Sequence, residues 1–106
     1  MNDKVKIVFT VPESDADRLR QAVGDLGAGK IGNYSHCSFS AKGIGRFSPE
    51  TGANPAVGHI GKAEEVIEER IEITCSANNF KTVVELIRLN HPYEEPVIDV
   101  YPLVAI

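Results

Sequence analysis

Two kinds of hydrophobic spacing alternate along this chain, and their order limits the folds that it can adopt. Apolar residues at every second position predict strands, and they occur at 5–11, 36–41, 66–75 and 97–103. Apolar residues at helical spacing predict helices, and they occur at 14–27 and 78–90. The order is strand, helix, strand, strand, helix, strand. This order predicts an α+β domain of the ferredoxin-like βαββαβ type.

The same order predicts how the elements are arranged. Right-handed crossovers joined by a central hairpin give a four-stranded antiparallel sheet with both helices on one face. The other face is left uncovered, and the last segment, from Val97 to Val104, is apolar on both sides. We therefore expect the chain to associate with copies of itself, as a homo-oligomer.

Composition narrows the class of protein. The 106 residues suffice for one domain, 1–106, with its own core. A net charge of −4 argues against a nucleic-acid partner, which needs a basic surface. The N-terminus lacks the pattern of a signal peptide, and no apolar run is long enough to span a bilayer. We expect a cytoplasmic protein without a membrane partner, in which Cys37 and Cys75 are reduced thiols.

The stretch from Lys42 to about Ala63 shows neither spacing. It contains GIGRFSPETGANPAVGHIG, with five glycines and two prolines, and predicts a long loop. Loops of this length inside a compact domain are uncommon and tend to be functional or disordered.

Acidic residues crowd the third strand, namely Glu64, Glu65, Glu68, Glu69 and Glu72. The simplest interpretation is a solvated face paired with Arg70 or with a base of a neighbouring subunit. Glu69, however, falls in phase with the apolar positions. Either the strand begins after Glu69, which we favour, or the carboxylate is buried beside a partner.

Common catalytic signals are missing or misplaced. Gly27–Gly32 matches G-x-G-x-x-G, but it leaves a helix instead of leading from a strand into one. In a P-loop alignment of the same region, Ile31 stands where a hydroxyl must bind magnesium. No metalloprotease, zinc-ribbon or nucleophile-elbow motif occurs. We therefore name no catalytic residue.

Two motifs resemble known families. His91–Pro96 reads HPYEEP and resembles the turn between the second helix and the last strand of CutA proteins. The glycine-rich segments 27–34 and 43–58, together with Cys37 and the acidic stretch 65–72, look like the PII-like domain inserted in the YqfO (Nif-three-like) family of dimetal proteins. The resemblance implies the insert's fold and a CutA- or PII-like trimer. It also implies that the long loop occupies the place of the partner-contacting loop of PII proteins.

The larger proteins of that family carry their metal-binding residues in flanking segments. The 106 residues contain no such segments, so we expect a stand-alone domain without dimetal hydrolase activity. The HPYEEP turn then has two interpretations. It is either a packed turn at a subunit boundary, or part of a pocket between subunits in which His91 and Glu94 meet His36 or Tyr34.

The candidate site residues follow from the second interpretation, except Arg46, which we select because an arginine in a glycine-rich loop can donate to an anion. Ligand-binding candidates are Tyr34, Arg46, His91, Tyr93 and Glu94. Candidate ligands for a divalent metal ion, the cofactor that these residue types could hold, are His36, Cys37, His91 and Glu94. The expected function is a non-catalytic, trimeric module that binds a small molecule, nucleotide or metal. The alternatives are a CutA-like copper binder and a metal-dependent hydrolase remnant.

Overall fold

The computed structural model describes residues 3–106 and has the expected element order. The strands are β1 (Lys4–Pro12), β2 (Phe39–Phe47), β3 (Glu64–Ser76) and β4 (Ile98–Pro102). The helices are α1 (Glu13–Asp25) and α2 (Phe80–Asn90). The sheet order is β2-β3-β1-β4 and every neighbouring pair is antiparallel. The ferredoxin-like prediction is confirmed.

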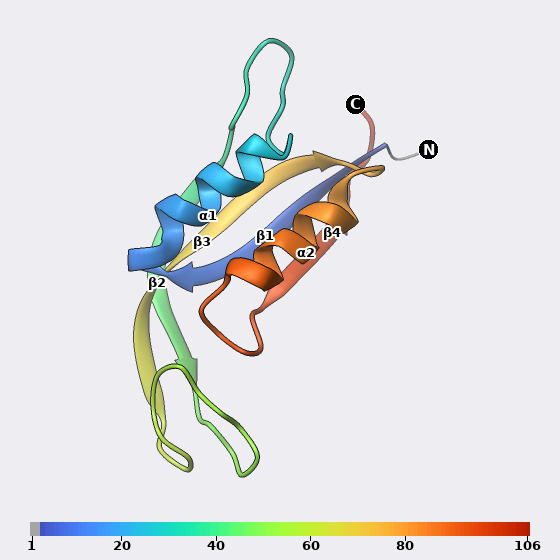
Figure 1. Ribbon diagram of the computed structural model, residues 1–106. Coiled ribbons are helices and arrows are strands. Elements are labelled where there is room, and N and C mark those ends of the chain that lie inside the picture. Colours follow the sequence, from blue (N-terminus) through green and yellow to red (C-terminus); the bar gives the residue numbers. More distant parts are fainter. Residues whose placement is uncertain (1–2) are drawn as a thin grey trace.

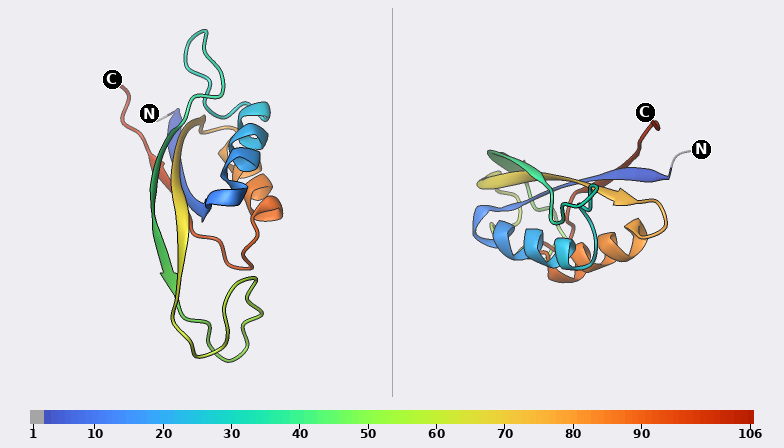
Figure 2. Two further views of the ribbon diagram at one scale, coloured as in Figure 1. Left: turned by 90° about the vertical axis from the view of Figure 1, so that its left-hand side faces the viewer. Right: turned by 90° about the horizontal axis from the view of Figure 1, so that it is seen from above.

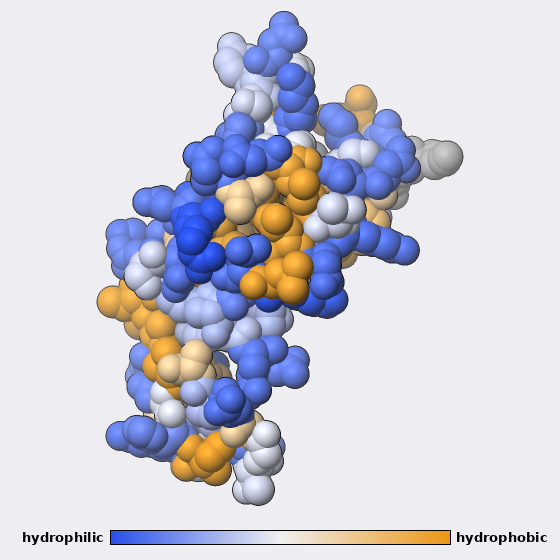
Figure 3. Space-filling view, in the orientation of Figure 1, coloured by the Kyte–Doolittle hydropathy of each residue, from blue (hydrophilic) through white to orange (hydrophobic). Residues whose placement is uncertain are grey.

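Both helices cover the same face of the sheet (Figures 1 and 2). The core between the layers is built from alternate residues of β1 and β3 and from one stripe of each helix. Its largest fully buried side chains are Phe9, Ile7, Leu19, Ile71, Ile87, Val11, Val23 and Val83. Between α1 and α2 this side of the molecule also shows an apolar surface (Figure 3). Neither helix within residues 3–106 is long and apolar enough to cross a membrane.

The central strand β3 pairs on both sides and is longer than its neighbour β1. Its pairing with β1 ends where Pro12 lies opposite Glu68, whereas its pairing with β2 continues to Phe47 opposite Glu64. Beyond the end of β1, β2 and β3 therefore form a two-stranded ribbon. The ribbon extends beyond both helices and carries the 48–63 loop at its tip (Figure 1).

Several predicted boundaries are wrong. Strand β2 does not begin at His36, which has a positive φ of 59°, but at Phe39, and it continues to Phe47. The loop therefore spans 48–63 and not 42–63. Gly43 and Gly45 belong to β2, but glycines have no side chains, so the sequence shows no strand alternation there. Helix α1 begins at Glu13 and ends at Asp25, whereas the predicted range is 14–27.

Glu69 is buried on the helix side of the sheet, so the favoured prediction that β3 begins after it is wrong. Its Oε1 accepts a hydrogen bond of 2.5 Å from Arg20 Nη1 of α1. The alternative, a buried carboxylate beside a partner, is the correct one. The pair also raises the pKa of Arg20, mainly through this hydrogen bond.

The uncovered face of the sheet is less apolar than the last strand suggested. Strand alternation places Val8, Phe39 and Tyr101 on this face, but also Lys6, Arg70, Glu72 and Asp99. Phe39 is 68% exposed and Val97, just before β4, is 60% exposed. The face thus combines exposed apolar side chains with charged ones.

We expect the Arg20–Glu69 pair to contribute measurably to stability. Replacing Arg20 by methionine keeps an apolar stem but leaves Glu69 buried without its partner. Removal of one partner of a fully buried pair costs about 3–5 kcal/mol. Because a quarter of the Arg20 side chain is exposed, we expect about 1–3 kcal/mol here. Urea unfolding at fixed protein concentration measures it.

Arg18→Met is the matched control, because Arg18 forms an exposed pair with Asp15 on the same helix. This change is expected to cost less than about 1 kcal/mol. Equal losses in the two variants would contradict the role given to Glu69.

Candidate functional site

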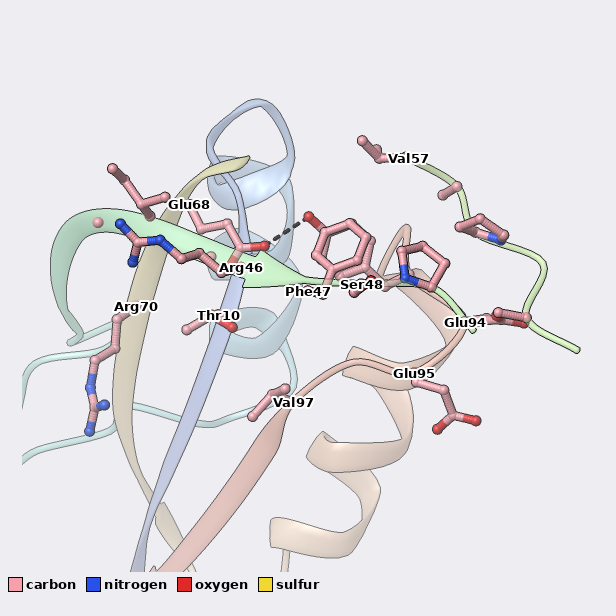
Figure 4. Close-up of a pocket in the computed structure, with 18 of the residues that line it drawn as sticks. Thr10, Arg46, Phe47, Ser48, Val57, Glu68, Arg70, Glu94, Glu95 and Val97 are labelled. Atoms are coloured by element: carbon pink, nitrogen blue, oxygen red, sulfur yellow. Dashed lines mark hydrogen bonds between the residues drawn. The ribbon is translucent and has the colours of Figure 1, made fainter. Parts of the chain in front are cut away.

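A cavity of about 700 Å³ lies where β1 ends, between the β2–β3 ribbon, the 48–63 loop and the His91–Pro96 turn (Figure 4). The ribbon contributes mainly Gly43, Gly45 and Glu68, and the turn contributes Tyr93 and Glu94. The loop contributes apolar residues, namely Pro49, Ala53, Pro55, Ala56 and Val57. This volume is within the usual range for a small-molecule site.

His91 fixes the turn from behind the cavity. It is buried, and its Nε2 lies 2.7 Å from the carbonyl oxygen of Thr10, to which it donates. Its Nδ1 accepts a hydrogen bond of 3.1 Å from the N–H of Tyr93. This pattern requires the neutral tautomer with the proton on Nε2, and it occupies both ring nitrogens. A metal at His91 would have to displace one of these hydrogen bonds.

Tyr93 crosses from the turn to the ribbon. Its hydroxyl donates to Glu68 Oε2 at 2.8 Å, and its ring centroid lies 5.8 Å from that of Phe47 and 5.1 Å from that of His91. Burial, followed by the hydrogen bond to the Glu68 carboxylate, raises the pKa of Tyr93 far above its ordinary value. Tyr93 is therefore a neutral donor over the whole physiological pH range.

Glu94 connects the turn to the loop. Its Oε1 accepts a hydrogen bond of 2.8 Å from the N–H of Asn54. Within the loop, Gly61 N–H donates to the carbonyl of buried Pro49 at 2.7 Å, and Ala53 N–H donates to that of Glu50 at 3.0 Å. The loop is thus held by its own backbone and by one side chain from the turn.

The structure brings together four of the predicted ligand-binding residues and separates the fifth. Arg46, Tyr93 and Glu94 line the cavity, and His91 supports it. Tyr34 is exposed in the loop after α1, at the opposite end of the molecule (Figure 1). The sequence did not single out Glu68 within its acidic stretch, although Gly45 and Tyr93 enclose it.

The predicted metal ligands also lie in two groups, at opposite ends of the folded molecule. His36 lies in the loop after α1, where Nε2 is 2.9 Å from Asp25 Oδ1 and Nδ1 is 2.9 Å from Ser35 Oγ. The hydrogen bond with His36 lowers the pKa of Asp25. Cys37 is a half-buried free thiol in the same loop. Within residues 3–106, no group of three His, Cys, Asp or Glu side chains is placed to hold a metal ion.

Known proteins resemble this chain in sequence and in structure. A protein of Halalkalibacterium halodurans named GTP cyclohydrolase 1 type 2 homolog is 47% identical over 98 residues, which are 92% of this chain and 26% of that protein. The protein of the same name from Mycobacterium tuberculosis is 44% identical over 102 residues, 96% of this chain and 27% of that protein. No family model matches the chain.

Among solved structures, the Bacillus cereus protein related to NIF3 is 43% identical with a TM-score of 0.84, over 98% of this chain and 26% of that protein. CutA from Archaeoglobus fulgidus, described as a periplasmic divalent cation tolerance protein, is 19% identical with a TM-score of 0.72, over 96% of this chain and 85% of that chain.

The fold therefore defines a CutA- and PII-like domain. In sequence the domain is homologous to one segment of the NIF3-related proteins that carry the name GTP cyclohydrolase 1 type 2 homolog. Both predicted resemblances are confirmed. The chain spans about a quarter of the length of these relatives, so their activity as whole proteins is not assigned to it.

The raised pKa of Tyr93 predicts a pH dependence of stability. The folded state keeps the phenolic proton, whereas the unfolded chain loses it near pH 10. The stabilisation is thus complete below about pH 10 and is lost as the pH rises from there toward the folded pKa. We expect the free energy of unfolding to fall above pH 10, and to fall less steeply in Tyr93→Phe. Urea unfolding at pH 8, 10 and 11 compares the two, and parallel curves would contradict the prediction.

The Glu94–Asn54 hydrogen bond predicts that the turn protects the loop. Glu94→Ala removes the acceptor, so the Asn54 amide is expected to exchange with deuterium about tenfold faster, as for the loss of one hydrogen bond. Glu94→Gln keeps an acceptor oxygen and serves as the control. Hydrogen-exchange NMR at the Asn54 amide measures the difference, and the idea fails if both variants exchange at the wild-type rate.

Proposed function

We propose that this chain is a non-catalytic, self-associating module that binds a small ligand in the cavity beside the His91–Pro96 turn. The observation that carries the proposal is the cavity itself, which has a volume suited to a small molecule. It is lined by apolar loop residues together with polar and charged groups from β2, β3, the loop and the turn. Three of these polar groups belong to residues selected from the sequence alone: Arg46, Tyr93 and Glu94.

Exposed apolar side chains on the uncovered face support self-association. Phe39 and Tyr101 are large and exposed there, next to charged side chains that could pair across an interface. Ring closure of identical subunits, as a trimer, is the arrangement that the CutA- and PII-like fold suggests for this chain. A divalent-metal site and a hydrolase remnant are the other functions proposed from the sequence, and neither has an observation in the described residues that favours it.

Two measurements test this function. Sedimentation equilibrium at micromolar concentration is expected to give three times the mass of one chain. Calorimetry of the same sample against nucleotides, divalent ions, amino acids and amines is expected to give binding heat with at least one of them. No heat from any compound, with the trimer present, would leave an assembly role without a ligand.

A pair of tryptophan variants locates the ligand. Ala56→Trp places a large side chain on the cavity lining and is expected to weaken binding at least about tenfold, because it takes up space that the ligand needs. Ala63→Trp places the same bulk on an exposed residue of the same loop outside the cavity lining, and is expected to bind as the wild type does. Equal affinities of the two variants would place the ligand elsewhere.

A further inference from the structure

Glu68 is a buried carboxylate in the cavity wall without a basic partner. It is 6% exposed, and its Oε2 accepts the hydrogen bond of Tyr93. Three other acids of β3 each lie beside an arginine, in the pairs Glu65–Arg46, Glu69–Arg20 and Glu72–Arg70. Among residues 3–106 no Lys, Arg or His nitrogen lies within salt-bridge distance of Glu68. A buried charge without a counter-charge is costly.

The second oxygen of Glu68 remains accessible from the cavity. Oε1 accepts no hydrogen bond from residues 3–106, yet no fully buried side-chain oxygen of these residues lacks a partner, so Oε1 keeps contact with solvent. Gly45 makes room for it, because a Cβ there would lie 2.1 Å from Oε1. Glu68 and Gly45 both line the cavity. Oε1 is therefore placed to accept a hydrogen bond from a ligand.

The unpaired charges around the cavity are also negative. Its three basic residues are each paired with an acid outside the lining: Lys42 with Glu13, Arg46 with Glu65 and Arg70 with Glu72. Figure 4 shows the guanidinium groups of Arg46 and Arg70 directed away from the loop that carries Val57. The four acidic lining residues, Glu50, Glu68, Glu94 and Glu95, have no basic partner in the part of the chain that the structure describes. The potential in the cavity favours a cation.

The walls favour an organic cation over a metal ion. Calcium and magnesium need about six oxygen ligands, and the described residues offer no group of three metal-ligating side chains. The rings of Phe47 and Tyr93 lie next to each other, the Tyr93 hydroxyl reaches Glu68, and Pro49, Pro55 and Val57 also line the cavity. Aromatic rings attract organic cations, and apolar walls accept the body of a small molecule.

We propose that the cavity binds a small organic cation, an amine, amidine or guanidine carried on a flat apolar body. The cationic head donates to Glu68 Oε1 while the Tyr93 hydroxyl holds Oε2, and the body lies between Phe47 and the prolines of the loop. This inference rests on the proposed function, and it adds the charge and shape of the ligand.

Three probes of one shape and different charge test the inference: benzamidine, benzamide and benzoate. We expect benzamidine to bind at least about tenfold more tightly than benzamide, as one charged hydrogen bond gives, and benzoate not to bind. NMR titration of the wild-type protein follows binding, and the Gly43 and Gly45 amide signals report it inside the cavity. Preferred binding of benzoate or benzamide at these signals would overturn the inference while leaving the proposed function intact. Absence of binding by all three would also overturn it, and the broader ligand panel would then judge the proposed function alone.

Two glutamine variants assign the effect to Glu68. Glu68→Gln keeps an oxygen for the Tyr93 hydroxyl, so it is expected to fold, and it should reduce benzamidine affinity about tenfold or more. Glu85→Gln removes the same charge from the exposed side of α2 and should bind benzamidine as the wild type does. Unchanged affinity in Glu68→Gln would refute the inference. If that variant does not fold, the order of the three probes on the wild type still decides.

Discussion

The pairing of β3 with strands on both sides is the constraint on which the rest of the structure depends. Because its register with β1 and β2 is continuous, consecutive side chains must point to opposite faces. Two adjacent carboxylates are thereby buried for different reasons. Glu69 turns toward the helices and meets Arg20, which ties α1 to the sheet. Glu68 turns to the other side, at the last residue pair of β1 and β3, where its carboxylate accepts the hydrogen bond of Tyr93. One carboxylate contributes to the fold, and its neighbour forms part of the cavity wall.

The His91–Pro96 turn forms one side of the cavity next to Glu68. Its histidine uses one nitrogen to hold the end of β1 and the other to hold the backbone of the next residue. Tyr93 is therefore fixed at the point where it can span the gap left by β1, and Glu94 is directed to the loop. The packed-turn and pocket interpretations of HPYEEP are thus compatible within one chain, because packing His91 is what positions Tyr93. The version with a pocket between subunits stays a prediction.

The sequence allowed the topology to be predicted because its two apolar periods are strong and occur in an unambiguous order. The prediction from sequence was wrong where residues show no hydrophobic alternation, or where a polar residue occupies a position that alternation assigns to the core. The second half of β2 was not predicted, because Gly43 and Gly45 have no side chains and therefore show no alternation. Glu69 breaks the apolar alternation, and only the structure reveals that Arg20, 49 residues earlier, compensates it. Nothing in the acidic stretch distinguishes Glu68 from its neighbours, because its burial depends on a tyrosine from a distant turn.

The proposed self-association and the proposed ligand site involve the same side of the sheet. Ala41 and Arg70 line the cavity and also lie on the uncovered face of the sheet, together with Phe39 and Tyr101. If the proposed self-association places a copy of the chain on Phe39 and Tyr101, that copy would lie next to the opening of the cavity at Ala41 and Arg70. Removal of water from that opening lowers the local dielectric, which strengthens the attraction between Glu68 and a bound cation. In this arrangement a ligand that neutralises Glu68 would favour the assembled state, because assembly without it would bury the uncompensated charge more deeply.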